Sequence, residues 1–180
     1  YCRPVVIGDA RIFQRGAEIC GLEIPMQVIS RVEDADWSKG IPVLDQRDLD
    51  PEEVPYAQIN VKSGQACLDM LRTGIELYKD GKIEGFCFAP LNKQAMIKAG
   101  CPFESEHHYM AHLFQHTEPF GEINVLGDLW TTRTTSHIPI SRVSHDLTEE
   151  TIMRAVRLAN VSLKNSGIEK PRLALAALNP

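Results

Sequence analysis

The sequence lacks the features that would assign it to a membrane, a secreted or a nucleic-acid-binding class. No apolar run approaches the roughly 18 residues that a membrane-spanning helix needs, and the start shows no signal-peptide cleavage pattern. The net charge is −5, whereas a general nucleic-acid binder normally carries a basic face. We therefore expect no membrane span and no nucleic-acid partner. An anionic small molecule is compatible with this charge, since a few local lysines or arginines can dominate one pocket.

Cysteine is sparse, and its spacing forms no recognisable framework. The five cysteines are odd in number and include no C-x-x-C pair: Cys2, Cys20, Cys67, Cys87 and Cys101. This spread suits reduced thiols better than a set of disulfides. We therefore expect a cytoplasmic protein.

Three glycine-rich motifs are absent as well. The chain contains no G-x-G-x-x-G, no G-x-x-x-x-G-K-[ST] and no G-x-S-x-G, so Rossmann, P-loop and hydrolase interpretations have no motif in support. The chain also lacks a Met at its start, and both ends read as strands already under way. We expect a chain that is incomplete at both ends.

What is present is a repeated alternation of apolar runs and helical patterns. We expect strands at 4–9, 26–32, 41–45, 83–90 and 173–178, with one or two more within 122–139. We expect helices at 11–22, 63–81, 92–100, 105–115 and 149–165. Ser63 and Thr148 are the expected N-caps of two of them, and Gly81 is placed to end the first. The alternation favours an α/β sheet with helices on both faces.

Four of the six histidines lie close together in the chain, between positions 107 and 116. His108, His112 and His116 stand four apart, so a helix would stack them on one face, and histidines at that spacing can bind zinc. The Glu of H-E-x-x-H is missing, however, because Tyr109 follows His108. Histidines on an exposed helix face are the commoner case, and a local zinc site is the less favoured alternative.

His137 stands at the end of the segment TTSHIPI, directly before Ile138 and Pro139. A strand that ends there would present an imidazole at the carboxyl edge of a sheet, where α/β proteins bind their ligands. A neutral imidazole can coordinate a divalent metal or bond to a substrate. From the residues alone, a satisfied histidine at a strand end is the more frequent alternative.

Lys93 follows the segment FAPLN and stands near the start of a short expected helix. A lysine beside free helix N–H groups would create a site that favours anions, although a surface lysine is the simpler interpretation. Arg133 also has two interpretations: it lies near the same site, or it is a partly buried salt-bridge partner.

Taken in order, five segments resemble the 4-hydroxythreonine-4-phosphate dehydrogenase family, PdxA. They are PVVIGD, IEGFCFAPLNKQAMIKAG, SEHHYMAHLF, TTSHIPI and GIEKPRLALAALNP, and they extend along essentially the whole chain. The resemblance implies a dimeric enzyme with a two-lobed α/β/α fold, related to isocitrate and isopropylmalate dehydrogenases. Residues 1–88 would belong to the first lobe and 89–180 to the second. It also implies NAD or NADP and a divalent metal (Zn, Mg, Mn or Co) as cofactors.

The resemblance also assigns roles to residues. His137 corresponds to a metal ligand of the family, and the other metal histidines would lie after Pro180 and in the partner subunit. Glu106-His107-His108 corresponds to a Gly-His-Thr substrate-binding segment, which implies that His107 and His108 bind substrate. Lys93 is retained and is implied in substrate polarisation or proton transfer.

The implied reaction is the oxidation of a phosphorylated β-hydroxy acid, followed by loss of CO2. The substrate would be 4-hydroxythreonine 4-phosphate or, by a second branch of the family, D-threonate or D-erythronate 4-phosphate. A third branch acts on aromatic dihydrodiols. The other alternative is a non-catalytic metal- or ligand-binding α/β fragment, and we expect these 180 residues alone to be inactive.

Overall fold

The computed structural model describes residues 2–103, 105–118, 120–136 and 138–179. The chain divides into two compact units, Tyr1–His116 and Thr117–Pro180. The lobe boundary expected between residues 88 and 89 stays a prediction.

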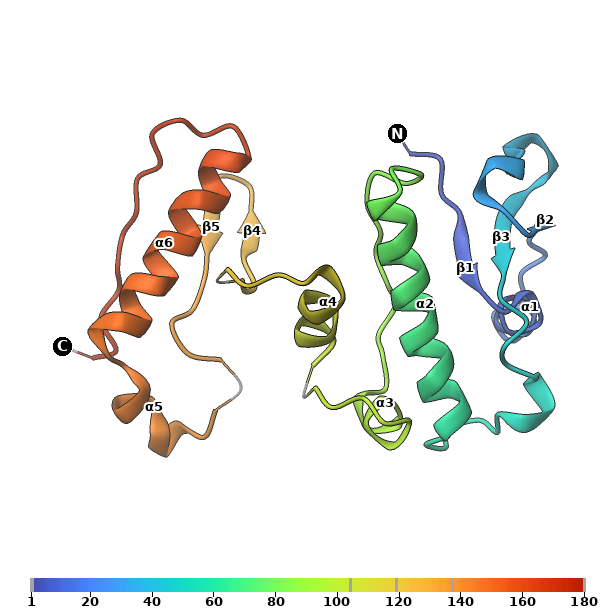
Figure 1. The fold of residues 1–180 in the computed structure, drawn as a ribbon, viewed down its shortest axis with the longest axis horizontal. Helices are drawn as coiled ribbons and strands as arrows, with labels where there is room; N and C mark the ends of the chain where they lie inside the picture. The colour runs from blue at the N-terminus through green and yellow to red at the C-terminus, as the bar shows by residue number, and fades with distance from the viewer. Residues whose placement is uncertain (1, 104, 119, 137, 180) are drawn as a thin grey trace. The chain divides into compact units, whose positions relative to one another are not determined.

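The first unit contains a parallel three-stranded sheet (Figure 1). Its strand order is β1 (Val6–Gly8), β3 (Ile41–Asp45) and β2 (Met26–Ile29). Val43 in the middle strand is fully buried and pairs with a valine on either side. Such a strand is buried on both faces, which explains its continuous apolar sequence. All three strands lie in segments that the apolar runs predict.

Helix α1 (Ala10–Ile19) follows β1 directly, and its N-cap Asp9 joins the two elements. The Asp9 carboxylate accepts the backbone N–H groups of Arg11 and Leu49 and pairs with the Arg11 guanidinium at 2.8 Å. Asp9 therefore ties the end of β1, the first turn of α1 and the chain after β3 together.

Helix α2 (Val61–Lys79) packs against β1 and is the longest helix within the described residues. It begins before Ser63, because Asn60 is its N-cap and accepts the backbone N–H of Ser63 at 3.2 Å. The expected cap at Ser63 is therefore wrong. Gly81 follows the helix with a φ of 68°, a left-handed conformation that glycine adopts without strain, as expected for a helix end.

Two segments that we expected to be strands, 83–90 and 173–178, are irregular in the structure. A strand forms only when a neighbouring chain segment satisfies its backbone N–H and C=O groups, and within the described residues no strand pairs with either segment. Their apolar side chains are largely left on the surface, with Leu175 66% exposed. Apolar composition alone does not identify the partner that a strand needs.

Within its described residues, the second unit contains a hairpin and two helices. β4 (Asn124–Leu126) and β5 (Leu129–Thr131) pair in antiparallel fashion around a tight turn. Both lie within 122–139, where the sequence predicts one or two strands. Helix α6 (Glu149–Asn165) begins at the expected N-cap, where Thr148 and Thr151 form a capping box. Helix α5 (Ile140–Asp146) was not expected, and it begins directly after Pro139, whose fixed φ suits a helix start.

The fold is thus mixed α/β, as expected, and its three-stranded sheet is parallel. The two-lobed α/β/α arrangement stays a prediction. None of the helices within the described residues is long and apolar enough to span a membrane.

Candidate functional site

Three of the predicted site residues lie at the starts of two short helices in the first unit. Lys93 is the first residue of α3 (Lys93–Lys98), and His107 and His108 lie in the first turn of α4 (Glu106–Phe114). Side-chain caps begin both helices: Asn92 accepts the backbone N–H of Ala95 in α3, and Ser105 caps α4. The structure brings the starts of these two helices together, because Lys93 of α3 forms an ion pair with Glu106 of α4.

Close packing against α2 sets the position of α3. At Gly64 of α2 the two helices approach so closely that a Cβ atom would collide with the backbone carbonyl of Ala95. Ala95 and Met96 are buried as a result, and Met96 joins a core cluster with Leu68. The opposite face of α3, which carries Lys93, is left exposed to solvent.

Helix α4 is held on the same core through Tyr109. Its side chain is buried, its hydroxyl donates to the backbone carbonyl of Leu68 at 3.4 Å, and Arg72 donates to that hydroxyl at 3.2 Å. Because Tyr109 lies in the first turns of α4, this contact also fixes the helix start, where His107 and His108 stand.

The side chain at the centre of this group is Glu106, which our sequence analysis did not select. One carboxylate oxygen, Oε2, lies 3.2 Å from Lys93 Nζ, and the other, Oε1, lies 4.0 Å from His107 Nδ1. The Glu106 side chain is only 13% exposed, whereas that of Lys93 is 48% exposed. The sequence pattern that could have identified Glu106 is an acidic residue directly after a serine cap and next to a histidine.

The Glu106 carboxyl is ionised at neutral pH. Burial acts to raise its pKa, but its own backbone N–H and the Lys93 ammonium act in the opposite direction, and the pKa lies below its usual range. A carboxylate near a lysine and an imidazole at the surface is an arrangement that can bind substrate oxygens and hold a proton.

The three histidines spaced four apart do not converge on a metal. Oγ of Ser105 lies 2.7 Å from His108 Nδ1, and the His112 ring stacks on Phe103 with centroids 5.1 Å apart. Helix α4 ends at Phe114, and the left-handed Gln115 turns the chain before His116. Among the described residues, no group of three His, Cys, Asp or Glu side chains could hold a metal ion.

His137, the predicted metal ligand, lies outside the described residues and stays a prediction. The strand that we expected to lead into it ends earlier, because β5 stops at Thr131. Arg133, between the two, forms an ion pair with Glu122 at 2.6 Å, so its interpretation as a salt-bridge partner holds.

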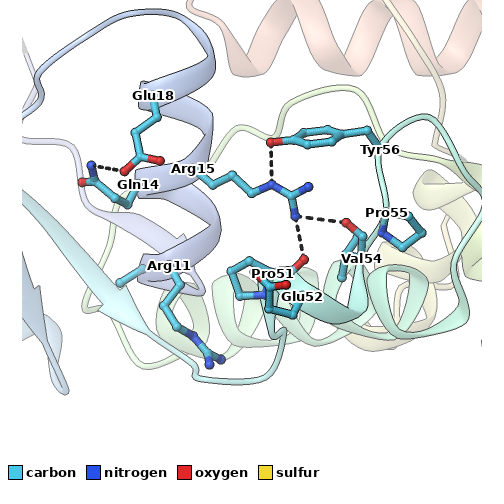
Figure 2. A pocket seen from close by; sticks show the side chains of 10 residues that line it. Arg11, Gln14, Arg15, Glu18, Pro51, Glu52, Val54, Pro55 and Tyr56 are labelled. Carbon is cyan, nitrogen blue, oxygen red and sulfur yellow. Dashed lines mark hydrogen bonds between the residues drawn. The ribbon is translucent and has the colours of Figure 1, made fainter.

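A hollow of the first unit lies elsewhere, between α1 and residues 51–56, and measures about 690 Å³ (Figure 2). Arg15 crosses it, donates to the carbonyls of Pro51 and Val54 and packs on the Tyr56 ring. These contacts attach the loop to α1, so Arg15 stabilises the fold here. None of the predicted site residues lines this hollow.

Comparison with known proteins places the whole sequence in one family. Residues 1–180 match the family model of the "Pyridoxal phosphate biosynthetic protein PdxA". A Pseudomonas aeruginosa protein named "Putative 4-hydroxythreonine-4-phosphate dehydrogenase 2" is 34% identical over 98% of this chain and 52% of its own length. The "D-threonate 4-phosphate dehydrogenase" of Cupriavidus necator is 27% identical over 99% of this chain and 54% of its own.

A solved structure supports the same assignment. The crystal structure of a 4-hydroxythreonine-4-phosphate dehydrogenase from Burkholderia phymatum matches 95% of this chain and 52% of its own, with 30% identity and a TM-score of 0.77. The chain spans about half the length of the curated relatives it matches. From the match to the family model over its full sequence, and from the shared fold, this chain belongs to the PdxA family.

Proposed function

We propose that this chain serves in the NAD- or NADP-dependent oxidation of a phosphorylated β-hydroxy acid, followed by decarboxylation. The substrate is 4-hydroxythreonine 4-phosphate or D-threonate 4-phosphate, the two substrates that appear in the names of its relatives. The observation that carries the proposal is the group of Lys93, Glu106 and His107 in a chain of this family.

Lys93 and His107 supply the polar contacts to the substrate in this proposal. The Lys93 ammonium has three N–H donors, so it pairs with Glu106 and still has the capacity to donate to a substrate oxygen. A cation near the reacting oxygen stabilises the negative charge that develops when the hydroxyl loses its proton and, later, when CO2 leaves. His107 at the same helix start binds the substrate, and His108 is its proposed neighbour in that role.

The nucleotide, when bound, accepts the hydride. A divalent metal (Zn, Mg, Mn or Co) with His137 as one ligand is also part of the proposal. The described residues do not supply a set of metal ligands by themselves. What this chain contributes is the binding and orientation of the substrate, and a proton-bearing group at Lys93 Nζ.

The proposed assembly is a homodimer in the cytoplasm. The β4–β5 hairpin exposes Val125, Leu126 and Leu129, and a two-stranded sheet by itself is only marginally stable in water. A second subunit on this hairpin would cover these side chains. The five cysteines are all unpaired, which agrees with a reducing compartment.

The test is an assay of both phosphorylated acids with NAD and with NADP, with and without a chelator. Because we expect these 180 residues alone to be inactive, the wild type here and below is the natural protein that carries this sequence, and each variant is made in it. Lys93→Met is expected to lower kcat by roughly 100-fold or more, since it removes a charge from the reacting centre. Lys98→Met, in the same helix, is the control and should leave kcat unchanged. Binding of either acid without any nucleotide reduction would instead favour the non-catalytic alternative, and turnover of a dihydrodiol alone would favour the third branch.

A further inference from the structure

We infer that Glu106 is a positioning residue, which holds the Lys93 ammonium where the substrate meets it. The inference rests on the function proposed above, because it assigns Lys93 the role that Glu106 serves. It concerns a side chain that the family resemblance does not supply, since the corresponding position of the family motif is glycine.

The contact joins the first residues of two helices. Lys93 begins α3, Glu106 begins α4, and their Nζ and Oε2 atoms lie 3.2 Å apart. Both helices are anchored on the core of α2, by Gly64 and Tyr109 respectively. The carboxylate therefore stands on a rigid support, whereas a lysine has a long flexible stem that would otherwise sample many rotamers.

Burial distinguishes a positioning role from direct contact with substrate. The Oε2 atom is fully covered, and within the described residues no hydrogen bond of good geometry reaches it, although the Lys93 ammonium is its nearest charge. A covered oxygen cannot touch a substrate. The Lys93 side chain, which is about half exposed, can do so. Through Oε2, Glu106 therefore acts on Lys93 and not on the substrate.

The local sequence explains why a carboxylate is stable at this position. Ser105 caps α4, which makes Glu106 the first helical residue, where the positive end of the helix favours an anion. A lysine at the start of α3 is placed against the same rule, because a cation is unfavourable there. Glu106 offsets this cost by supplying the counter-charge, and it also restricts the Lys93 ammonium to one position.

The kinetic test uses Glu106→Gln, which keeps the shape and removes the charge. We expect kcat to fall by roughly 10- to 100-fold, the scale of a misplaced catalytic group, with KM little changed. In a Lys93→Met background the same substitution should have no further effect, because its action passes through Lys93. An equal loss in both backgrounds would show that Glu106 acts independently of Lys93 and would overturn the inference.

A second test needs no turnover. The rate at which an amine-specific acylating reagent labels Lys93, read by peptide mass spectrometry, should rise several-fold in Glu106→Gln, because the carboxylate no longer holds the protonated amine. Lys98 is the internal control, and its labelling rate should be the same in the wild type and in Glu106→Gln. Glu53→Gln, which removes an exposed pair with Lys62, is the control variant and should leave the labelling rate of Lys93 unchanged. Glu106→Asp, which retains the charge, should return the rate towards that of the wild type.

The two tests separate the inference from the proposed function. If the wild type reduces neither nucleotide with either acid, the proposed function fails, while faster labelling of Lys93 in Glu106→Gln would still support the contact. If labelling of Lys93 is the same in wild type and variant, Glu106 does not hold the ammonium, and the inference fails even in an active enzyme.

Discussion

Asp9 shows how one buried carboxylate can serve the first unit without belonging to the site. Hydrogen bonds from the Arg11 side chain lower its pKa from 3.8 to about 2, against the opposing effect of burial, with help from the backbone N–H groups of Leu49 and Arg11. A group whose pKa is depressed on folding adds stability above its unfolded pKa and loses it as the pH falls through the folded value. The stability that Asp9 contributes is therefore complete above about pH 4 and is lost between about pH 4 and pH 2.

The prediction at this scale is that Asp9→Asn lowers the free energy of unfolding by about 1–2 kcal/mol at pH 7, and by much less near pH 2. Urea unfolding followed at several pH values measures the difference. Glu23→Gln, an exposed acid in the loop after α1, should show no such pH-dependent loss. A loss of the same size at pH 2 as at pH 7 would mean that the charge of Asp9 is not the cause.

At the scale of elements, the contact between α2 and α3 determines where Lys93 lies. The helices meet at Gly64, where any side chain would run into the backbone of Ala95. A backbone cannot move aside as a flexible side chain can, so α3 must shift if a methyl group is added. The site and the core are therefore coupled through one glycine.

Gly64→Ala is accordingly expected to destabilise the protein by roughly 1–3 kcal/mol, the usual cost of overpacking, and to lower kcat. The matched control is Gly16→Ala in α1, where a Cβ meets nothing within 4 Å. That substitution should raise stability by roughly 0.5–1 kcal/mol, since alanine favours helix. Thermal unfolding of both variants measures these changes in stability. A Gly64→Ala variant as stable as the wild type would show that the two helices can separate freely.

At the scale of the whole molecule, several large apolar side chains of the second unit are exposed to solvent. Leu126 at the tip of the β4–β5 hairpin is 81% exposed and Ile140 is 91% exposed. Contiguous exposed apolar patches commonly mark an interface, and the proposed homodimer would use the β4–β5 hairpin in this way.

Leu126→Glu is therefore predicted to weaken self-association by roughly 10- to 100-fold in Kd, since it places a charge in an apolar contact. Analytical ultracentrifugation across a range of concentrations measures this. Leu22→Glu, at an exposed leucine of the first unit, is the control and should leave Kd unchanged. A wild type that sediments as a monomer at all concentrations would contradict the proposed dimer.

Local signals in the sequence by themselves determined most helices, the positions of the three strands of the sheet, the strands within 122–139, the cap at Thr148 and the helix end at Gly81. These depend on residues within a few positions of each other, where propensity and capping act. The family resemblance, carried by segments along the whole chain, selected Lys93, His107, His108 and His137 as site residues, and these roles stay predictions.

Only the tertiary structure decided the rest. Whether 83–90 and 173–178 become strands depends on a partner strand, and periodicity does not contain that information. The role of Gly64 depends on a helix that lies about 30 residues further along the chain. Glu106 was missed because its role comes from Lys93, which lies 13 positions earlier in the sequence and 3.2 Å away in space. An ion pair between two helix starts exists only once both helices have packed on a common core.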